Sequence, residues 1–173
     1  MLSVMEERLH TYLLGERRAG RTYLLLAVAA VIGGALPLAT LPTPFWRGFS
    51  VAVLALALIE FWSGWQFANR YRDLQERLPA LLARHPARYR AEELERCGRL
   101  EQQYARQRTV VLLFLVLGIT LALLGGVVQA RPLTMGMGYG LCLQGAILLV
   151  LDLAAQWRNG IYYQQVDHFN PTA

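Results

Sequence analysis

Two acidic residues stand inside the apolar stretches of this 173-residue chain, at Glu60 and Asp152. Each is followed five residues later by a tryptophan and eleven residues later by a tyrosine; these are Trp65, Tyr71, Trp157 and Tyr163. A carboxyl group within hydrocarbon is costly, so it is found where it pairs with another polar group or serves an ion or proton pathway. The matched surroundings of the two acids indicate one motif that was duplicated.

Two kinds of chemistry remain open for these acids. In a structural clasp, an arginine that begins a neighbouring span reaches up to each carboxylate, and hydroxyl and amide groups complete the hydrogen bonds. In a cation or proton pathway, the acids face a bundle interior or an oligomer axis, with Gln144, Thr120 and Tyr139 as further lining. The candidate intramembrane polar site comprises Glu60, Asp152, Tyr71, Tyr163, Gln156, Arg21 and Arg108.

Catalysis is not predicted. Hydrolysis within a membrane needs a nucleophile with a base, paired aspartates or a metal cluster, and the three histidines (His10, His85 and His168) lie outside the apolar stretches and far apart. Cys142 has no histidine nearby in any span, and the Gly-rich run at 136–140 sits in an apolar segment rather than between a strand and a helix. We therefore expect no enzyme activity, no cofactor and no metal.

The acids must be positioned by membrane-spanning helices. The chain is 55% hydrophobic and 17% charged, with a mean hydropathy of +0.30. Its apolar runs cover residues 22–41, 48–68, 109–130 and 133–157, and each is close to the roughly 20 residues that cross a bilayer as a helix. The sequence predicts an all-α polytopic membrane protein with four transmembrane helices in a lipid bilayer.

Charge placement predicts the orientation of these helices. All 17 basic residues are arginine, and all but Arg47 and Arg131 lie before span one, between spans two and three, or after span four. This positive-inside pattern puts both termini and the central segment in the cytoplasm, and it explains the net charge of +5 without nucleic-acid binding. Exclusive use of arginine is typical of a GC-rich bacterial genome, so we expect the bacterial inner membrane.

Three segments lie outside the spans. Residues 1–21 read as an amphipathic helix on the cytoplasmic leaflet, either an anchor or a targeting or lid element. Residues 69–108 read as a cytoplasmic helical hairpin that breaks at His85 and Pro86, with a milder interruption at Pro79. Its apolar stripes would pack against each other or against another copy. Residues 158–173 read as a cytoplasmic tail.

The chain also contains a weak internal repeat. Gly48 aligned with Gly140 superposes span two on span four without gaps. Residues 22–68 and 109–157 then form two transmembrane hairpins with the same orientation, a parallel repeat about a pseudo-two-fold axis along the membrane normal. Because the tryptophans lie about 140° around the helix from the acids, indoles facing lipid would turn both carboxyl groups inward.

Small residues recur at helical spacing in spans three and four. Such strips allow close approach of helices in a bilayer, where no hydrophobic driving force brings them together. The expected packing positions are Gly118, Ala122, Gly126, Gly136, Gly140 and Gly145. Packing within the four-helix bundle is the favoured interpretation, and a contact between copies is the alternative.

In architecture the chain is similar to small four-span bacterial proteins that protect a cell from pore-forming toxins. The likeness rests on size, inside termini, short outer loops and the lack of catalytic residues. It implies helix-to-helix contact with another membrane protein or a membrane-inserted toxin segment, as an immunity-type protein or an accessory subunit. The competing interpretation is a homo-oligomeric cation or proton channel that uses Glu60 and Asp152.

Overall fold

The computed structural model describes residues 2–128 and 131–170, and nearly all of them are helical. The elements are α1 (Leu2–Thr40), α2 (Pro44–Arg84), α3 (Pro86–Leu123), a π-helical turn (Leu124–Val128) and α4 (Pro132–Asp167). Four helices are long and apolar enough to cross a membrane. The prediction of an all-α chain with four membrane-length helices is confirmed, and these helices are compatible with a multi-pass membrane protein.

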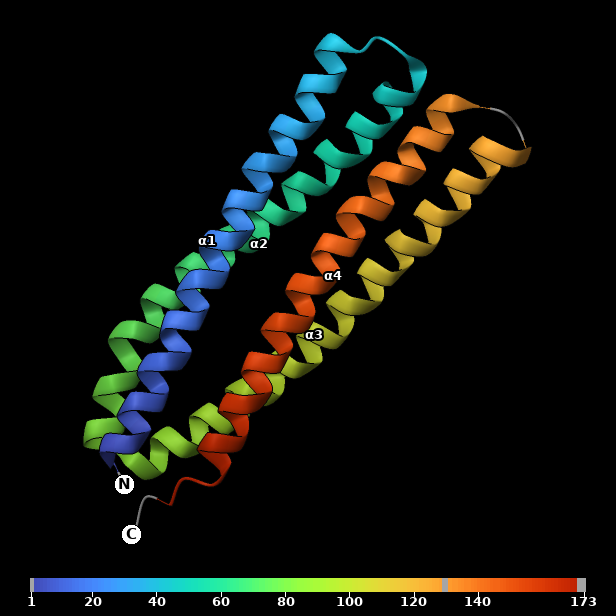
Figure 1. Ribbon diagram of the computed structural model, residues 1–173. Coiled ribbons are helices and arrows are strands. Elements are labelled where there is room, and N and C mark those ends of the chain that lie inside the picture. The colour runs from blue at the N-terminus through green and yellow to red at the C-terminus, as the bar shows by residue number, and fades with distance from the viewer. Residues whose placement is uncertain (1, 129–130, 171–173) are drawn as a thin grey trace.

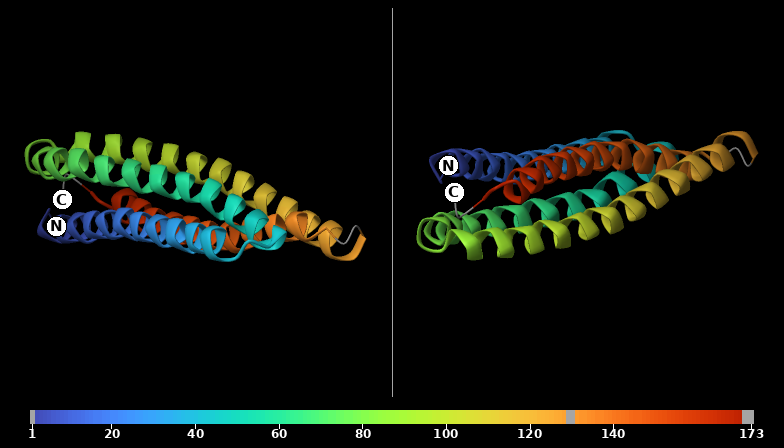
Figure 2. Two further views of the ribbon diagram at one scale, coloured as in Figure 1. Left: turned by 90° about the horizontal axis from the view of Figure 1, so that it is seen from above. Right: turned by 90° about the horizontal axis from the view of Figure 1, so that it is seen from below.

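The four helices form two antiparallel pairs, α1 with α2 and α3 with α4 (Figure 1). The pairs join along α2 and α4, which both begin at the same end of the bundle and run in the same direction. Contacts between α1 and α4, and between α2 and α3, are much sparser. We call the end that carries both termini the terminal end and the opposite end the far end (Figure 2).

Proline and threonine mark the helix boundaries. Pro44, Pro86 and Pro132 each begin a helix, where the missing N–H costs nothing and the fixed φ is already helical. The Thr43 hydroxyl accepts a hydrogen bond from the Trp46 backbone N–H at 3.5 Å, which caps α2. His85, at φ −141° and ψ 70°, separates α2 from α3.

The expected interruption at Pro79 is wrong, because α2 continues through it. The predicted surface helix is also wrong: residues 2–21 are the first turns of α1 and run into the first span without a break. Their apolar stripe (Met5, Leu9, Tyr12 and Leu13) is buried in protein rather than in lipid. An apolar stripe at helical spacing predicts that one face of the helix is shielded from water, and here the other three helices shield it.

That stripe belongs to a core at the terminal end, the terminal-end core. Its buried members are Met5, Leu9, Tyr12, Leu13, Leu74, Leu78, Leu82, Tyr89, Cys97, Tyr162, Val166 and Phe169. All four helices contribute, so the apolar stripes of residues 69–108 do not pack chiefly on each other as expected. Residues 158–167, predicted as a tail, are the last turns of α4 and fill this core together with α1.

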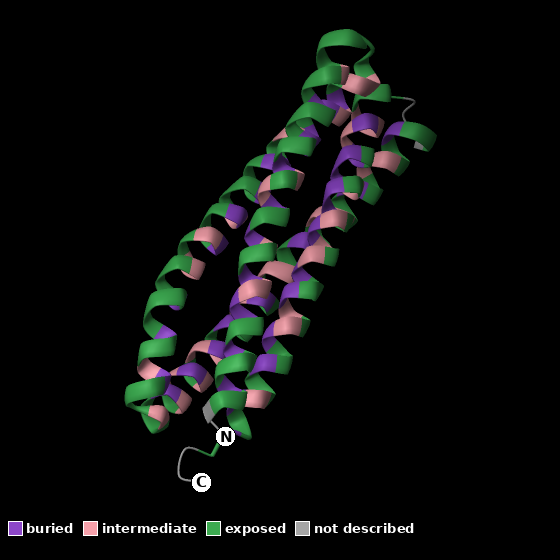
Figure 3. Ribbon diagram, turned by 60° about the vertical axis from the view of Figure 1, so that its left-hand side comes forward, coloured by how far each residue is buried: buried purple, intermediate pink, exposed green. Residues whose placement is uncertain are grey.

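Glycines set the helix contacts toward the far end. A Cβ on Gly140 would stand 2.7 Å from the Phe49 carbonyl oxygen on α2, and one on Gly136 would lie closer still to the Phe45 carbonyl oxygen. On other faces, a Cβ on Gly118 would stand 3.0 Å from the Gly138 carbonyl oxygen, and one on Gly145 would stand 3.0 Å from the Leu115 side chain. Buried residues accordingly form a stripe along each helix (Figure 3). The packing glycines of α4 therefore divide between α2 and α3.

One expected packing position is displaced by a residue. Ala122 lies against Gly138, as part of the α3–α4 contact, but Gly126 is exposed and a Cβ there would meet only the flexible Met135 side chain, at 3.6 Å. Gly125 is buried instead, and its carbonyl oxygen accepts from the Arg131 N–H at 2.7 Å. An offset of seven residues returns to within about 20° of Gly118, whereas eight residues lie about 80° away.

Candidate functional site

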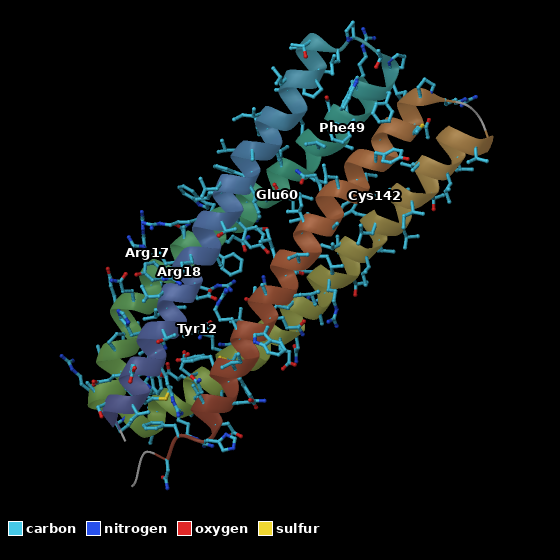
Figure 4. The ribbon with its side chains drawn as sticks, in the orientation of Figure 1. Tyr12, Arg17, Arg18, Phe49, Glu60 and Cys142 are labelled. Atoms are coloured by element: carbon cyan, nitrogen blue, oxygen red, sulfur yellow. The ribbon has the colours of Figure 1, made fainter. Side chains whose placement is uncertain are left out.

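Both acids point into the bundle. Glu60 is fully buried and Asp152 is 7% exposed, whereas Trp65 and Trp157 are 53% and 75% exposed. The indoles therefore face outward and the carboxyl groups inward, as the offset of five residues predicts. Glu60 lies about halfway along the bundle (Figure 4).

The two acids do not pair. Asp152 lines a cavity together with Ile59 and Ser63, which flank Glu60 along α2, but Glu60 itself is not in that lining. No hydrogen bond joins the two carboxyl groups, and among the described residues neither oxygen of Glu60 has a hydrogen-bond partner. Asp152 Oδ2 is likewise unpartnered. A buried polar atom without a partner destabilises the fold unless a proton, water or ligand satisfies it.

The expected clasp does not form as predicted, because no ion pair joins an arginine to either acid in the described residues. Arg108 instead donates to the Gln156 side-chain oxygen at 3.2 Å, one helical turn from Asp152. In the other half Arg21 is exposed and lines a separate groove with Tyr71. Tyr163 is 38% exposed and lies away from the acids. Asp152, Gln156 and Arg108 thus form one cluster, while Glu60, Arg21, Tyr71 and Tyr163 do not join it.

A cavity of about 230 Å³ opens beside Asp152, where α2 and α3 diverge. Asp152 and Leu148 of α4 and Tyr23 of α1 also line it. Its walls are mainly apolar, formed by Ile59, Phe67, Val110, Val111 and Phe114. Ser63 adds a hydroxyl, and Arg106 and Gln107 lie toward the terminal end. We call this space the acid cavity.

Tyr23 links the acid cavity to the rest of the interior. Its ring stacks on Phe67 with centroids 5.3 Å apart. Phe67 lines the same cavity, so the two stacked rings join α1 and α2 at this wall.

A second polar cluster lies inside the terminal-end core. Glu93 and Arg96 form an ion pair with two contacts, Nε to Oε1 at 2.9 Å and Nη2 to Oε2 at 2.8 Å. Tyr162 donates to Glu93 Oε2 at 3.0 Å, and its hydroxyl oxygen lies 2.6 Å from that of Tyr89. Because the Tyr162 O–H donates its hydrogen bond to Glu93, Tyr89 is the donor in the contact between the two hydroxyls. The Tyr12 ring stacks on Tyr162 with centroids 3.9 Å apart.

Between this cluster and the acid cavity lies a third group of buried polar residues. Arg158 donates to Glu16 Oε1 at 2.9 Å, and Asn159 donates to the Cys97 carbonyl oxygen at 3.2 Å. Burial raises the pKa of the Cys97 thiol to about 12 and that of Tyr104 to about 12. Buried atoms without a partner here are Glu16 Oε2, Tyr104 Oη, Arg158 Nε and Asn159 Oδ1. Polar groups therefore continue from the acid cavity to the terminal end.

The buried acids Glu16 and Glu93 are not among the functional residues predicted from the sequence. A usable signal was present. Glu16 follows Tyr12 by four residues, and Glu93 stands four residues from both Tyr89 and Cys97. An acid at the spacing of an apolar stripe faces the same core as that stripe.

The described residues contain no group of three His, Cys, Asp or Glu side chains placed to hold a metal ion. Comparison with protein-family models, with curated proteins and with solved structures finds no match to this chain.

Proposed function

We propose that this protein is a non-enzymatic binding protein of the bacterial inner membrane, with cytoplasmic termini, that receives a membrane segment of another protein in the acid cavity. The observation that carries the proposal is the cavity itself. It opens between α2 and α3, its walls are mainly apolar, and Asp152 lies in its lining with one oxygen unpartnered. An immunity-type protein or an accessory subunit works through such contact.

The occupant is an apolar transmembrane helix with one hydrogen-bond donor at the depth of Asp152. A helix of leucine-like residues matches the cavity wall, and a lysine, arginine or asparagine side chain satisfies the free carboxyl oxygen. Hydrogen bonds between helices in a bilayer contribute about 1–2 kcal/mol in model peptides. The donor therefore decides which segments bind.

A designed peptide tests this assignment. Two labelled leucine-rich transmembrane peptides, one with a single central asparagine and one with leucine there, are reconstituted with the labelled protein, and energy transfer is measured. We expect transfer with the asparagine peptide, weaker transfer with the leucine peptide, and loss of this difference in Asp152→Leu, which has no acceptor for the asparagine N–H.

A matched pair of bulky variants locates the contact. Val110→Trp fills the cavity wall, whereas Leu113→Trp places the same ring on the outward face of α3. We expect the first variant to abolish transfer and the second to retain it. Equal energy transfer for the two peptides, or equal effects of the two tryptophan variants, would refute the proposal. So would a protein mass in nanodiscs that shows a second copy of the chain in the acid cavity.

The second candidate, a cation or proton conduit, is favoured by one observation. Unpartnered buried polar atoms of Ser50, Glu60, Gln144 and Asp152 lie along the two central helices. The suggested lining residues Thr120 and Tyr139 are exposed on outward faces, so they do not contribute within one chain. Any path would follow α2 and α4.

Flux separates the two candidates. In proteoliposomes that contain a pH-sensitive dye, a conduit loses proton flux in Glu60→Gln and Asp152→Asn while the protein stays folded. A binding protein shows no flux before or after substitution. Measurable wild-type flux that the Glu60→Gln variant abolishes would decide for the conduit.

A further inference from the structure

A groove between α1 and α2 gathers three arginines at the level where the first two spans begin and end. It has a volume of about 430 Å³ and is separate from the acid cavity. We call it the arginine groove, and its lining is Arg17, Arg21, Leu24, Ala68, Tyr71, Arg72 and Gln75. No acidic residue is in that lining.

None of these three arginines has a carboxylate partner, in contrast to six other arginines of the described chain. Arg77, Arg88, Arg90, Arg96, Arg99 and Arg158 each form an ion pair. In the described part of the chain, no ion pair involves Arg17, Arg21 or Arg72. Asp73 and Glu76, the acids nearest to Arg72 along α2, form no ion pair with any of the three. Three cations without counter-charges thus share one concave surface.

The surroundings of the groove match the boundary between lipid headgroups and acyl chains. Leu24 and Ala68 close it on the side of the apolar spans, and exposed Leu25 and Val28 continue the surface of α1 beyond it. On the other side Gln75 adds a neutral hydrogen-bonding group.

The arrangement of the arginines suits a phosphate group. The Arg17 guanidinium lies over the Tyr71 ring at 6.0 Å, which restricts its position. Guanidinium groups bind phosphate through paired N–H donors, and clusters of arginine at a cytoplasmic membrane surface attract anionic lipids.

From this geometry we infer that the arginine groove binds the phosphate headgroup of an anionic glycerophospholipid, with its acyl chains along the apolar surface of α1. The inference is independent of the proposed function, because the groove lies on α1 and α2 and shares no residue with the acid cavity. A lipid rather than a free phosphate ion is indicated because one side of the groove continues into the lipid-facing surface of the spans.

Native mass spectrometry tests the inference on the full chain in neutral detergent. Phosphatidylglycerol and phosphatidylcholine with the same acyl chains are titrated separately, and lipid adducts are counted. We expect phosphatidylglycerol to bind more tightly. The variant Arg17→Gln/Arg21→Gln/Arg72→Gln should lose roughly tenfold or more of that affinity, since each arginine contributes to anionic-lipid binding.

The control variant Arg84→Gln/Arg88→Gln/Arg99→Gln removes the same charge from the part of the bundle nearest the His85 turn. We expect it to bind phosphatidylglycerol like the wild type. Equal losses in the two triple variants would show general charge attraction and overturn the site. Displacement of phosphatidylglycerol by millimolar inorganic phosphate would assign the groove to the free ion instead.

Folding of each variant is checked by circular dichroism. If the triple groove variant fails to fold, Arg72→Gln alone replaces it, because this exposed side chain makes no contact that the fold needs. Its expected effect is a several-fold loss of affinity for phosphatidylglycerol. Unchanged binding by a folded Arg72→Gln protein would then contradict the inference.

Discussion

Glu93 and Arg96 are paired through two contacts inside the terminal-end core, three residues apart on α3. The Glu93 side chain is fully enclosed and that of Arg96 largely so. Tyr162 donates to the same carboxylate and Tyr12 accepts from the same guanidinium, so the pair joins α1, α3 and α4. The ion pair therefore holds together helices that belong to different hairpins.

We predict that Glu93→Gln lowers the free energy of unfolding by about 3–5 kcal/mol, because it leaves the buried Arg96 charge uncompensated. Glu95→Gln is the matched control, since Glu95 pairs with Arg99 on the exposed face of the same helix. That variant should change stability by about 0–1 kcal/mol. Thermal unfolding in detergent measures both, and equal shifts would contradict a structural role for the Glu93 pair.

We predict that stability falls at alkaline pH. Burial raises the pKa of the Cys97 thiol from 9.0 to about 12, so the unfolded chain loses this proton first. The contribution of the thiol is complete below pH 9 and is lost as the pH rises toward 12. Cys97→Ala should flatten the unfolding free energy between pH 9 and pH 11. An identical pH profile for the variant would assign the alkaline loss to other groups.

Tyr104 extends the same behaviour to higher pH. Its pKa is raised by burial from 10.0 to about 12, so its contribution is complete below pH 10 and disappears toward pH 12. Between pH 8 and pH 11, Tyr104→Phe should therefore lose less unfolding free energy than the wild type. Urea unfolding followed by tryptophan fluorescence at pH 8 and pH 11 provides the comparison.

We predict that one methyl group is enough to disturb the contact of α2 with α4. In Gly136→Ala the new Cβ meets the Phe45 backbone carbonyl, which cannot rotate away, and overpacking of this kind costs about 1–3 kcal/mol. Gly160→Ala, on the same helix, has open space around the new Cβ and should gain up to about 1 kcal/mol from helix propensity. Melting temperatures of the two proteins should move in opposite directions.

We predict that Arg21 and Arg108, which open spans one and three, differ in their contribution to stability. Arg108→Gln removes the hydrogen bond to Gln156 beside Asp152 and should cost about 1–3 kcal/mol. Arg21→Gln removes an exposed side chain and should cost little in detergent without anionic lipid. Denaturant unfolding of the two single variants tests this difference. Equal costs would restore the symmetric clasp that the repeat suggests.

The sequence predicts the helices well because their signals are local. Runs of about 20 apolar residues and the proline after His85 depend only on neighbouring residues, and the described structure has four membrane-length helices with a break at that position. The inward direction of Glu60 also follows from local geometry, through its offset from Trp65.

The sequence does not predict what covers each face. The stripe of Met5, Leu9 and Leu13 has the spacing of a lipid-binding helix and of a core helix alike, and only the arrangement of all four helices decides between them. The burial of Glu16 and Glu93 could not be predicted for the same reason, since it depends on which tertiary partners surround each carboxylate. The predicted pairing of Arg21 with Glu60 does not occur, because the weak repeat determines neither the depth of Arg21 along the bundle nor the direction of its side chain.

The helices are 36 to 41 residues long, which corresponds to about 54–62 Å, or nearly twice the thickness of the hydrocarbon core. Each is therefore long enough to cross the hydrocarbon core and to extend by a similar length beyond it. Because the terminal-end core joins all four helices, a tilt of any one helix at that end requires its neighbours to move with it.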